Sequence, residues 1–398
     1  MASISGAAAR AQSVEPKGSE SIANLPRPGY EAGRWRFGNI VVAPVLSAET
    51  QYDSNVFAVS KAAQDDAIFN FGPRVDVTAD GSRLNVAADV EANIRRLTTY
   101  TTENRVTFGA GTSAIYDASP TLSFDGIARF DRGAVNRSDP EASPLLRRPS
   151  KTNVILADVG ASYRRNRFGI ALRADILRVN YLEASEDDRD LNNTSASLRL
   201  SWAASTRLGL FVQGYGNRRD AVLPFDRSGV NRDASTIGAL AGVTLDISGR
   251  WKGDIGVGAF KANSDDPTQA SFSDVAVRAS LSYTPSPRTA FKLKLVRGDN
   301  GTIRSGASGR VNTVAALTFE GEARHNLLVH AAVGFEDTVY RGFLVRHLQQ
   351  YSVDGEVEYL FGSRWSLYVN ARYADRSANQ IFDQYKKTTA SIGLRVRV

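Results

Sequence analysis

Apolar and polar residues alternate at every second position along most of the chain, and the carboxyl-terminal segment shows this most clearly. Its two interleaved sets are Ala390, Ile392, Leu394, Val396 and Val398, and Ser391, Gly393, Arg395 and Arg397. Side chains of a β-strand point to alternate faces, so this segment has one apolar and one polar face. In a helix the same period would scatter the apolar residues around the axis. The pattern therefore predicts a strand.

The same alternation recurs in about eighteen segments along the chain. We expect strands near 38–52, 67–79, 84–98, 104–118, 121–134, 151–164, 167–181, 191–203, 207–219, 233–247, 250–262, 271–284, 288–299, 309–322, 326–340, 347–360, 364–376 and 385–398. Short connections alternate with longer polar ones near 53–66, 135–150, 182–190, 220–232, 263–270, 300–308, 341–346 and 377–384. Outer-membrane barrels have short periplasmic turns and longer external loops. The sequence thus predicts an all-β fold, a transmembrane antiparallel up-and-down β-barrel with both termini in the periplasm.

Hydropathy and strand length support this fold over its alternatives. The chain has no run of eighteen apolar residues, which excludes a transmembrane helix. Its mean hydropathy is −0.26, a value that alternating membrane strands permit. Strands of a soluble β-sandwich average about six residues, and the expected strands are much longer. They exceed even the roughly nine to eleven residues that cross a bilayer, so the barrel wall should extend beyond the lipid.

Arginines and large aromatic residues flank the short turns. The arginines are Arg83, Arg167, Arg207, Arg250, Arg288, Arg324 and Arg364, and the aromatics that we assign to the membrane interface are Trp202, Trp251, Tyr283, Tyr359 and Trp365. Aromatic rings concentrate where membrane meets water. Arginines beside them can reach lipid phosphate, so we expect contact with outer-membrane lipid and lipopolysaccharide.

Three regions divide the chain. Residues 1–11 end in Ala9-Arg10-Ala11, the form of a signal-peptidase site, although no charged and apolar segment precedes it; we interpret them as a signal-peptide remnant. Residues 12–37 contain several prolines and are interpreted as an extended periplasmic leader. Residues 38–398 would form the barrel.

The first of these strands and its leader resemble a known family. The stretch LPRPGYEAGRWRFG at 25–38, the segment Val42 to Pro44, and the tip Tyr52, Asp53, Asn55 and Phe57 are similar to the amino-terminal signature of a putative β-barrel porin family of Gram-negative outer membranes. This resemblance implies an outer-membrane barrel without enzyme activity, often linked to exopolysaccharide loci. It implies no functional residues. The Tyr52–Phe57 tip would order the first external loop.

The last residues form a second recognisable pattern. Ser391, Gly393, Val396 and Val398 resemble the carboxyl-terminal signal that the barrel-assembly machinery reads in outer-membrane proteins. That machinery is therefore an expected partner. The final residue of such signals is usually aromatic, and Val398 departs from this rule.

Charged residues on the polar face should line the lumen. We assign as pore-lining Arg95, Arg129, Arg173, Arg199, Arg278, Lys292, Lys294, Asp354, Glu356, Glu358, Arg372 and Arg395. A dry core could not hold so many charges, and eighteen strands leave room for water. Basic and acidic stripes could act as a transverse field or as a salt-bridge network. Inward Phe211, Tyr215, Phe260 and Tyr368 are candidates for an aromatic track, and the loops near 53–66 and 135–150 could fold inward.

Composition excludes several chemistries. Cysteine is absent and only three histidines occur, so thiolate metal sites are excluded and a histidine site is unexpected. No Ser–His pair has a distinctive spacing, so we expect no enzyme, no cofactor and no metal. The acidic run at 183–190 could hold a divalent ion, but a solvated loop is the simpler interpretation. The net charge of +7 does not indicate nucleic acid, because no binding motif accompanies it.

Three functions remain open from the sequence. The first is a porin-like channel that serves as a conduit for exopolysaccharide, with polysaccharide export components as partners. The second is a general diffusion porin for small solutes. The third is a closed barrel with a structural or surface-recognition role.

Overall fold

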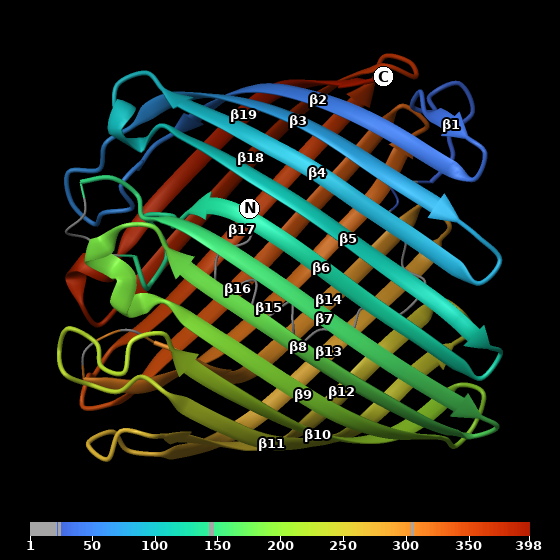
Figure 1. Ribbon diagram of the computed structural model, residues 1–398. Helices are drawn as coiled ribbons and strands as arrows, with labels where there is room; N and C mark the ends of the chain where they lie inside the picture. Colours follow the sequence, from blue (N-terminus) through green and yellow to red (C-terminus); the bar gives the residue numbers. More distant parts are fainter. Residues whose placement is uncertain (1–21, 23–24, 143–146, 303, 305) are drawn as a thin grey trace.

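Eighteen strands close into one barrel in the computed structural model, which describes residues 22, 25–142, 147–302, 304 and 306–398 (Figure 1). Each of the strands β2–β19 pairs antiparallel with its neighbour in sequence, and β19 pairs with β2 to complete the ring. Closure removes the free sheet edges, which in a membrane would leave unpaired backbone groups. The predicted fold is confirmed.

The strand bounds agree with the expected ones to within a few residues. They are β2 Ile40–Asp53, β3 Asp66–Asp80, β4 Leu84–Leu97, β5 Arg105–Ser119, β6 Leu122–Ala134, β7 Lys151–Arg165, β8 Phe168–Tyr181, β9 Leu191–Ala203, β10 Leu208–Ala221, β11 Ala234–Ile247, β12 Trp251–Ser264, β13 Phe272–Ser286, β14 Thr289–Asn300, β15 Ala307–Arg324, β16 Leu327–Gly342, β17 His347–Leu360, β18 Trp365–Ala378 and β19 Tyr385–Arg397. Short 3₁₀ turns occur at η2 Thr101–Glu103, η3 Ala184–Arg189 and η4 Ile381–Asp383.

One short strand, β1 Trp35–Phe37, lies within the segment that we interpreted as an extended leader. It pairs with the start of β2, with Phe37 opposite Ile40. Gly38 makes this tight reversal at a φ of 64°, a conformation that glycine adopts without steric cost. Residues 1–21, which include the proposed signal-peptide remnant and part of the leader, lie outside the described residues.

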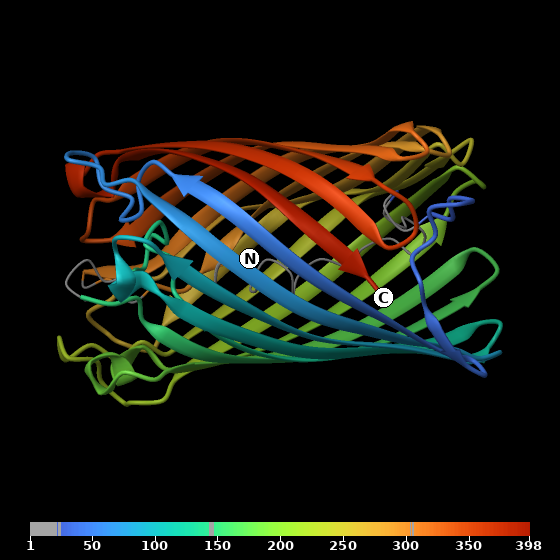
Figure 2. The same ribbon diagram turned by 90° about the horizontal axis from the view of Figure 1, so that it is seen from above.

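The two ends of the barrel differ (Figures 1 and 2). The short connections, such as the one between β7 and β8, gather at the end where β1 and the carboxyl terminus also lie. We call this the turn end. The long connections gather at the opposite end, which we call the loop end.

The outer face of the wall is apolar, and aromatic rings form a row near the turn end. Trp251 stacks on Tyr283 with ring centroids 4.2 Å apart, Tyr283 on Phe291 at 6.2 Å, and Phe291 contacts Phe319 at 5.2 Å. These rings come from four consecutive strands, β12 to β15. Trp202, Tyr359 and Trp365 are also exposed. No helix in the described part of the chain is long and apolar enough to cross a membrane.

Candidate functional site

Ion pairs join neighbouring strands along the inner face of the wall. Arg129 of β6 contacts Asp89 at 2.9 Å, Glu91 at 2.6 Å and Asp131 at 2.9 Å. Arg173 of β8 contacts carboxylates of β6 and β7 in the same way. Each arginine therefore neutralises charge across two or three strands.

The predicted acidic and basic stripes pair with each other locally. Arg395 of β19 contacts Glu356 at 3.0 Å and Glu358 at 2.7 Å, reaching past β18 to β17. Lys292 likewise contacts Glu320 on the adjacent strand at 2.9 Å. Of our two interpretations, this arrangement favours the salt-bridge network over a transverse field.

The other predicted pore-lining residues have varied surroundings. Arg199 contacts Asp254 at 2.5 Å and Arg95 contacts Asp53 at 3.6 Å, while Asp354 lies 3.7 Å from His330. Arg372 is exposed on the inner face of β18, and Arg278 is partly buried on β13. Lys294 lies two residues from Lys292 on the same face of β14, opposite Ala316 of β15.

The expected aromatic track is wrong for three of its four candidates, because their rings are buried. The ring of Phe211 lies under the guanidinium of Arg199, 3.6 Å from its centroid. Tyr368 is covered similarly by Arg395 and donates a hydrogen bond to Glu49 at 2.9 Å. Phe260 belongs to an apolar cluster with Leu240. Such rings stiffen the wall and offer no surface to a passing polymer.

The four residues of the predicted carboxyl-terminal signal lie on or next to the closing strand. Ser391 and Gly393 face the lumen, where the Ser391 hydroxyl is 3.5 Å from a carboxylate oxygen of Glu49. Gly393 leaves room for the Tyr368 ring, since a Cβ there would lie 2.5 Å from ring atoms. Val396 pairs with Leu46, and the Val398 amide donates to the Pro44 carbonyl at 3.1 Å. The motif thus also forms the seam of the barrel.

The connection between β6 and β7 folds into the lumen at the loop end. Residues 135–142 of this connection, which we call the inner loop, reach strands of the opposite wall; residues 143–146 lie outside the described part. Val135 packs on Leu177, Val179 and Tyr181 of β8, and these three side chains are buried. From this anchor the loop extends toward β15, which lies half-way round the ring from β6.

Arginines of the opposite wall hold the backbone of the inner loop. Arg304 donates to the Pro140 carbonyl at 2.7 Å, and Arg346 donates to the same carbonyl at 2.9 Å. Arg376 of β18 donates to the Ser138 carbonyl at 2.6 Å. Hydrogen bonds from charged donors are the stronger kind, so the loop is fixed across the lumen rather than hanging from one side.

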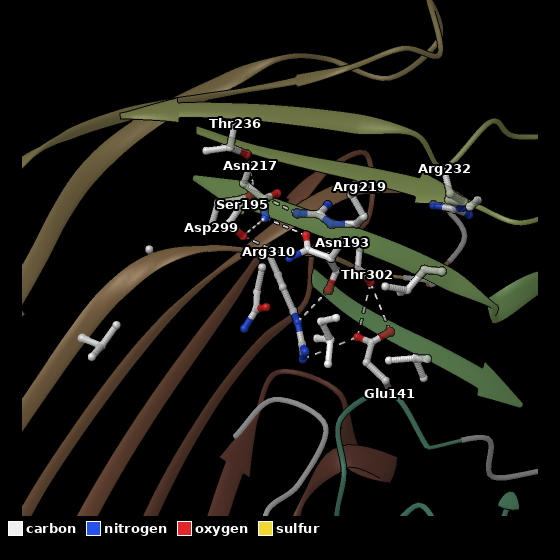
Figure 3. Close-up of a pocket in the computed structure, with 18 of the residues that line it drawn as sticks. Glu141, Asn193, Ser195, Asn217, Arg219, Arg232, Thr236, Asp299, Thr302 and Arg310 are labelled. Carbon is white, nitrogen blue, oxygen red and sulfur yellow. Dashed lines mark hydrogen bonds and ion pairs between the residues drawn. The ribbon is translucent and has the colours of Figure 1, made fainter. Parts of the chain in front are cut away.

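Glu141 is the central side chain of these contacts (Figure 3). It accepts a hydrogen bond from the Tyr340 hydroxyl at 2.5 Å and lies 3.2 Å from the Thr302 hydroxyl. The guanidinium of Arg310 is 3.7 Å away. Arg346, which donates to the Tyr340 hydroxyl at 2.6 Å, also pairs with Asp383. Burial disfavours its charge, but the hydrogen bond and charge of Asp383 together with nearby Tyr340 and Glu141 outweigh this and raise the pKa of Arg346.

The loop at 53–66 remains beside its own strands. Asn55 donates to the Val59 carbonyl at 2.8 Å and to the Lys386 carbonyl at 2.9 Å, and it accepts from the Val59 amide. Asp53 pairs with Lys387 at 2.7 Å. These contacts bind the loop to the β2–β19 seam, so it does not reach across the lumen as the inner loop does.

A cavity lies between the inner loop and the wall from β8 to β15 (Figure 3). Its lining includes Glu141 from the loop and, from the wall, a mixture of arginine, amide, hydroxyl and carboxylate groups. The strand residues with polar side chains are Tyr181, Asn193, Ser195, Tyr215, Asn217, Arg219, Thr236, Arg278, Arg297, Asp299, Asn300 and Arg310. Apolar side chains, Leu191 and Leu240 among them, line other parts of the cavity. Such a surface can bind a polar solute without a cofactor.

The amino-terminal segment contacts the inner wall at the turn end. Arg27 pairs with Glu322 of β15 at 3.0 Å, and both side chains are nearly inaccessible. The Ile22 amide donates to Glu320 at 3.0 Å, and Arg288 donates to the Pro26 carbonyl at 3.0 Å. Part of the leader is therefore docked on β15, five strands from β2 round the ring.

The acidic loop at 183–190 is held by arginines. Glu186 pairs with Arg189, and Asp187 pairs with Arg227 at 2.8 Å. Among the residues that the structure describes, no cluster of three or more His, Cys, Asp and Glu has the arrangement of a metal site. Glu186, Arg189 and Asp190 are buried, so this part of the loop is packed and the interpretation as a solvated loop is wrong for these residues.

Sequence reasoning missed the residues that hold the inner loop, although β8 carries a signal for it. Leu177, Val179 and Tyr181 occupy the face of β8 that should be polar, while Ile176 on the other face is apolar and exposed. Apolar residues on both faces at one end of a strand indicate that a loop covers the inner face. The partners Glu141, Arg304 and Arg346 carry no such periodic signal.

Comparisons with known proteins fit this architecture. The chain matches the family model described as "Putative beta-barrel porin 2" over residues 27–398. No curated protein matches it. Solved structures of similar shape include OccAB3 of Acinetobacter baumannii, with 10% identity, a TM-score of 0.42, and coverage of 91% of this chain and 100% of that one. The outer membrane protein opdK of Pseudomonas aeruginosa has 11% identity, a TM-score of 0.43, and coverage of 90% and 99%. These loose similarities carry no information on what passes through this barrel.

Proposed function

The chain belongs to the "Putative beta-barrel porin 2" family and is an outer-membrane β-barrel, and from this premise we propose that it is a diffusion channel for small polar solutes. Its inner wall is lined with charged groups, which need a charged partner or water, and some of them, such as Arg372, are exposed. The lumen of an eighteen-strand barrel is wide enough to hold that water. A diffusion channel requires such a hydrated path through the lumen.

The observation that carries this proposal is the inner loop. Its contacts with Arg304, Arg346 and Arg376 fix it across the lumen, and it narrows the path between the two ends. A narrowed, hydrated path admits small solutes and hinders large ones. Acidic and basic groups are nearly balanced on the inner face, so we expect weak ion selectivity.

The turn end holds β1 and the carboxyl terminus, and we propose that it faces the periplasm. Short periplasmic turns and longer external loops are the rule for such barrels. The row from Trp251 to Phe319 would then lie at the periplasmic interface of the membrane. Assembly by the barrel-assembly machinery and contact with lipopolysaccharide follow from the same placement.

Export of an exopolysaccharide is the second candidate, and it rests on the family resemblance. A polymer chain would need the inner loop to leave the lumen, because the loop spans it. Deletion of the gene with no change in polymer secretion would argue against this candidate. The same result would be consistent with a diffusion channel.

Single-channel conductance of the refolded chain in a planar bilayer tests the main proposal. We expect discrete open steps, and larger steps when residues 136–149 are replaced by a short Gly-Ser turn. A matched control shortens the loop at 54–65, which stays beside its own strands, and should leave the step size nearly unchanged. Silence of both the native chain and the shortened variant over a wide voltage range would contradict the proposal and favour a closed barrel.

A further inference from the structure

Arg278 has an unusual position on the inner wall. It lies on β13 opposite Gly256 of β12, is partly buried, and lines the cavity beneath the inner loop. Within the described ranges its guanidinium forms no hydrogen bond and no ion pair. A guanidinium has five N–H donors in a rigid fork, and most other arginines of this wall use theirs.

The carboxylate that acts most strongly on the charge of Arg278 already binds another arginine. Asp254 influences Arg278 most among the acids, but Arg199 binds Asp254 at 2.5 Å. Arg199 also donates to the Thr244 hydroxyl at 3.0 Å and lies over the Phe211 ring. Two guanidinium groups therefore face one carboxylate, which leaves one positive charge available to a ligand.

The cavity that Arg278 lines also carries amide and hydroxyl groups, several of which are labelled in Figure 3. Asn217 donates to Asn193 at 2.6 Å and to Ser195 at 3.1 Å, which orients the three side chains in one row. The Tyr215 ring, which packs into the space left by Gly238, adds an aromatic surface. Oriented amides and hydroxyls beside an aromatic ring suit a hydroxylated ligand.

Four polar atoms of the lining are buried without a hydrogen-bond partner among the described residues: Nε of Arg189, Nη2 of Arg232, Nη1 of Arg310 and Oδ1 of Asp299. The last two are a donor and an acceptor on the adjacent strands β15 and β14. The Arg310 side chain is 5% exposed, and its Nη1 is 3.7 Å from Glu141, too far for a hydrogen bond. A ligand with both oxygen acceptors and hydroxyl donors matches this pair, whereas an ion such as chloride matches only the donor.

We propose that this cavity binds a hydroxylated monocarboxylate, a sugar acid, with its carboxylate on Arg278. A guanidinium fork fits a carboxylate in two parallel hydrogen bonds. The hydroxyls would face Asn193, Asn217 and Asp299. Carboxylates of the lining, Glu141 and Asp299 among them, disfavour a dianion, so the ligand carries one negative charge. This inference rests on the proposed function in one respect, namely that the ligand reaches the cavity by diffusion through the lumen.

Calorimetric titration of the full chain in detergent tests this binding with galacturonate and with neutral galactose as probes. We expect galacturonate to bind at least about tenfold more tightly than galactose, since one charged hydrogen-bond pair accounts for that factor. The variant R278Q should lose that difference. The control R372Q removes an equal charge from the inner face of β18, outside the cavity. It should still bind galacturonate more tightly than galactose.

Equal affinity for the two sugars, or an unchanged galacturonate affinity in R278Q, would overturn the inference. Equal losses in R278Q and R372Q would also overturn it, because they would mean a general effect of lumen charge. The titration needs no open channel. A barrel that shows no conductance but binds galacturonate would refute the proposed function and support this site. An open barrel that does not bind galacturonate would refute this site and support the proposed function.

Discussion

The carboxylate of Glu141 in the inner loop accepts a hydrogen bond of 2.5 Å from the hydroxyl of Tyr340 on β16. The two residues are 199 positions apart in the chain, and the contact ties the β6–β7 connection to the far wall. The Tyr340 hydroxyl also accepts from Arg346. The Tyr340 hydroxyl therefore links Glu141 of the inner loop to Arg346, which itself donates to the Pro140 carbonyl.

Removing that hydroxyl should loosen the inner loop. Y340F leaves Glu141 and Arg346 without a shared partner, and an unsatisfied buried polar group costs about 1–3 kcal/mol. We expect noisier single-channel currents with more frequent excursions to a larger conductance. The control Y359F deletes a hydroxyl from an exposed tyrosine of the outer face. Identical current traces for native chain and Y340F would show that the loop does not depend on this contact.

The glycine of the closing strand should be required for packing against Tyr368. In G393A the new Cβ would lie 2.5 Å from the Tyr368 ring, so the ring or the strand must shift, and overpacking typically costs about 1–3 kcal/mol. We expect a lower urea midpoint for the refolded barrel. The double variant G393A/Y368A removes the ring and leaves only the contact with the Glu49 Cβ at 2.8 Å. G393A should therefore destabilise Y368A less than it destabilises the native chain.

The same double variant separates packing from recognition by the assembly machinery. If yields of assembled barrel in cells remain low in G393A/Y368A although its stability in vitro is close to that of Y368A, the glycine is read as a signal in its own right. Recovery of both quantities would assign its role to packing.

The docked leader should depend on the ion pair between Arg27 and Glu322. Both side chains are at most 5% exposed. Glu322 keeps Arg288 and His325 as partners, so loss of Arg27 should cost less than the roughly 3–5 kcal/mol of a buried charge left without any partner. We expect R27A to release residues 22–34 to protease at the turn end while the barrel stays intact. R36A, in an exposed arginine of β1, is the matched control. Equal cleavage of R27A and the native chain would refute the anchoring role.

The connection between β10 and β11 should open at acid pH. Burial would raise the pKa of Asp226, but hydrogen bonds from Ser228, the Val230 amide and Arg232 outweigh it and lower the pKa. A lowered pKa means that the ionised carboxylate stabilises the folded loop above the ordinary value of about 3.9, and that this stabilisation is lost as the pH falls through the folded value.

Hydrogen exchange, corrected for the intrinsic rate, measures this opening at the amides of Ser228 and Val230. Protection should be constant near neutral pH and should fall on acidification. D226N cannot ionise, so its protection should be lower than that of the native chain near neutral pH and should not change with pH. Protection that persists in the native chain at the lowest pH reached would contradict the assignment.

The sequence by itself determined the wall of the barrel. Alternation with a period of two fixes which face of each strand meets lipid, as at Leu394 and Arg395, and the length of each connection fixes which end it joins. These properties are local, since each can be found within one hairpin. The strand between Trp35 and Phe37 was missed because three residues are too short to show a period.

Only the tertiary structure decided what fills the lumen. Glu141 meets Tyr340 and Arg310, and Asp254 meets Arg199 in place of Arg278, because closure of the ring brings together strands that are far apart in sequence. Period-two analysis shows that a side chain faces inward, but it does not show which inward side chain lies opposite. The choice depends on strand order, register and the course of a loop with no repeat, and these are set by the packing of the whole ring.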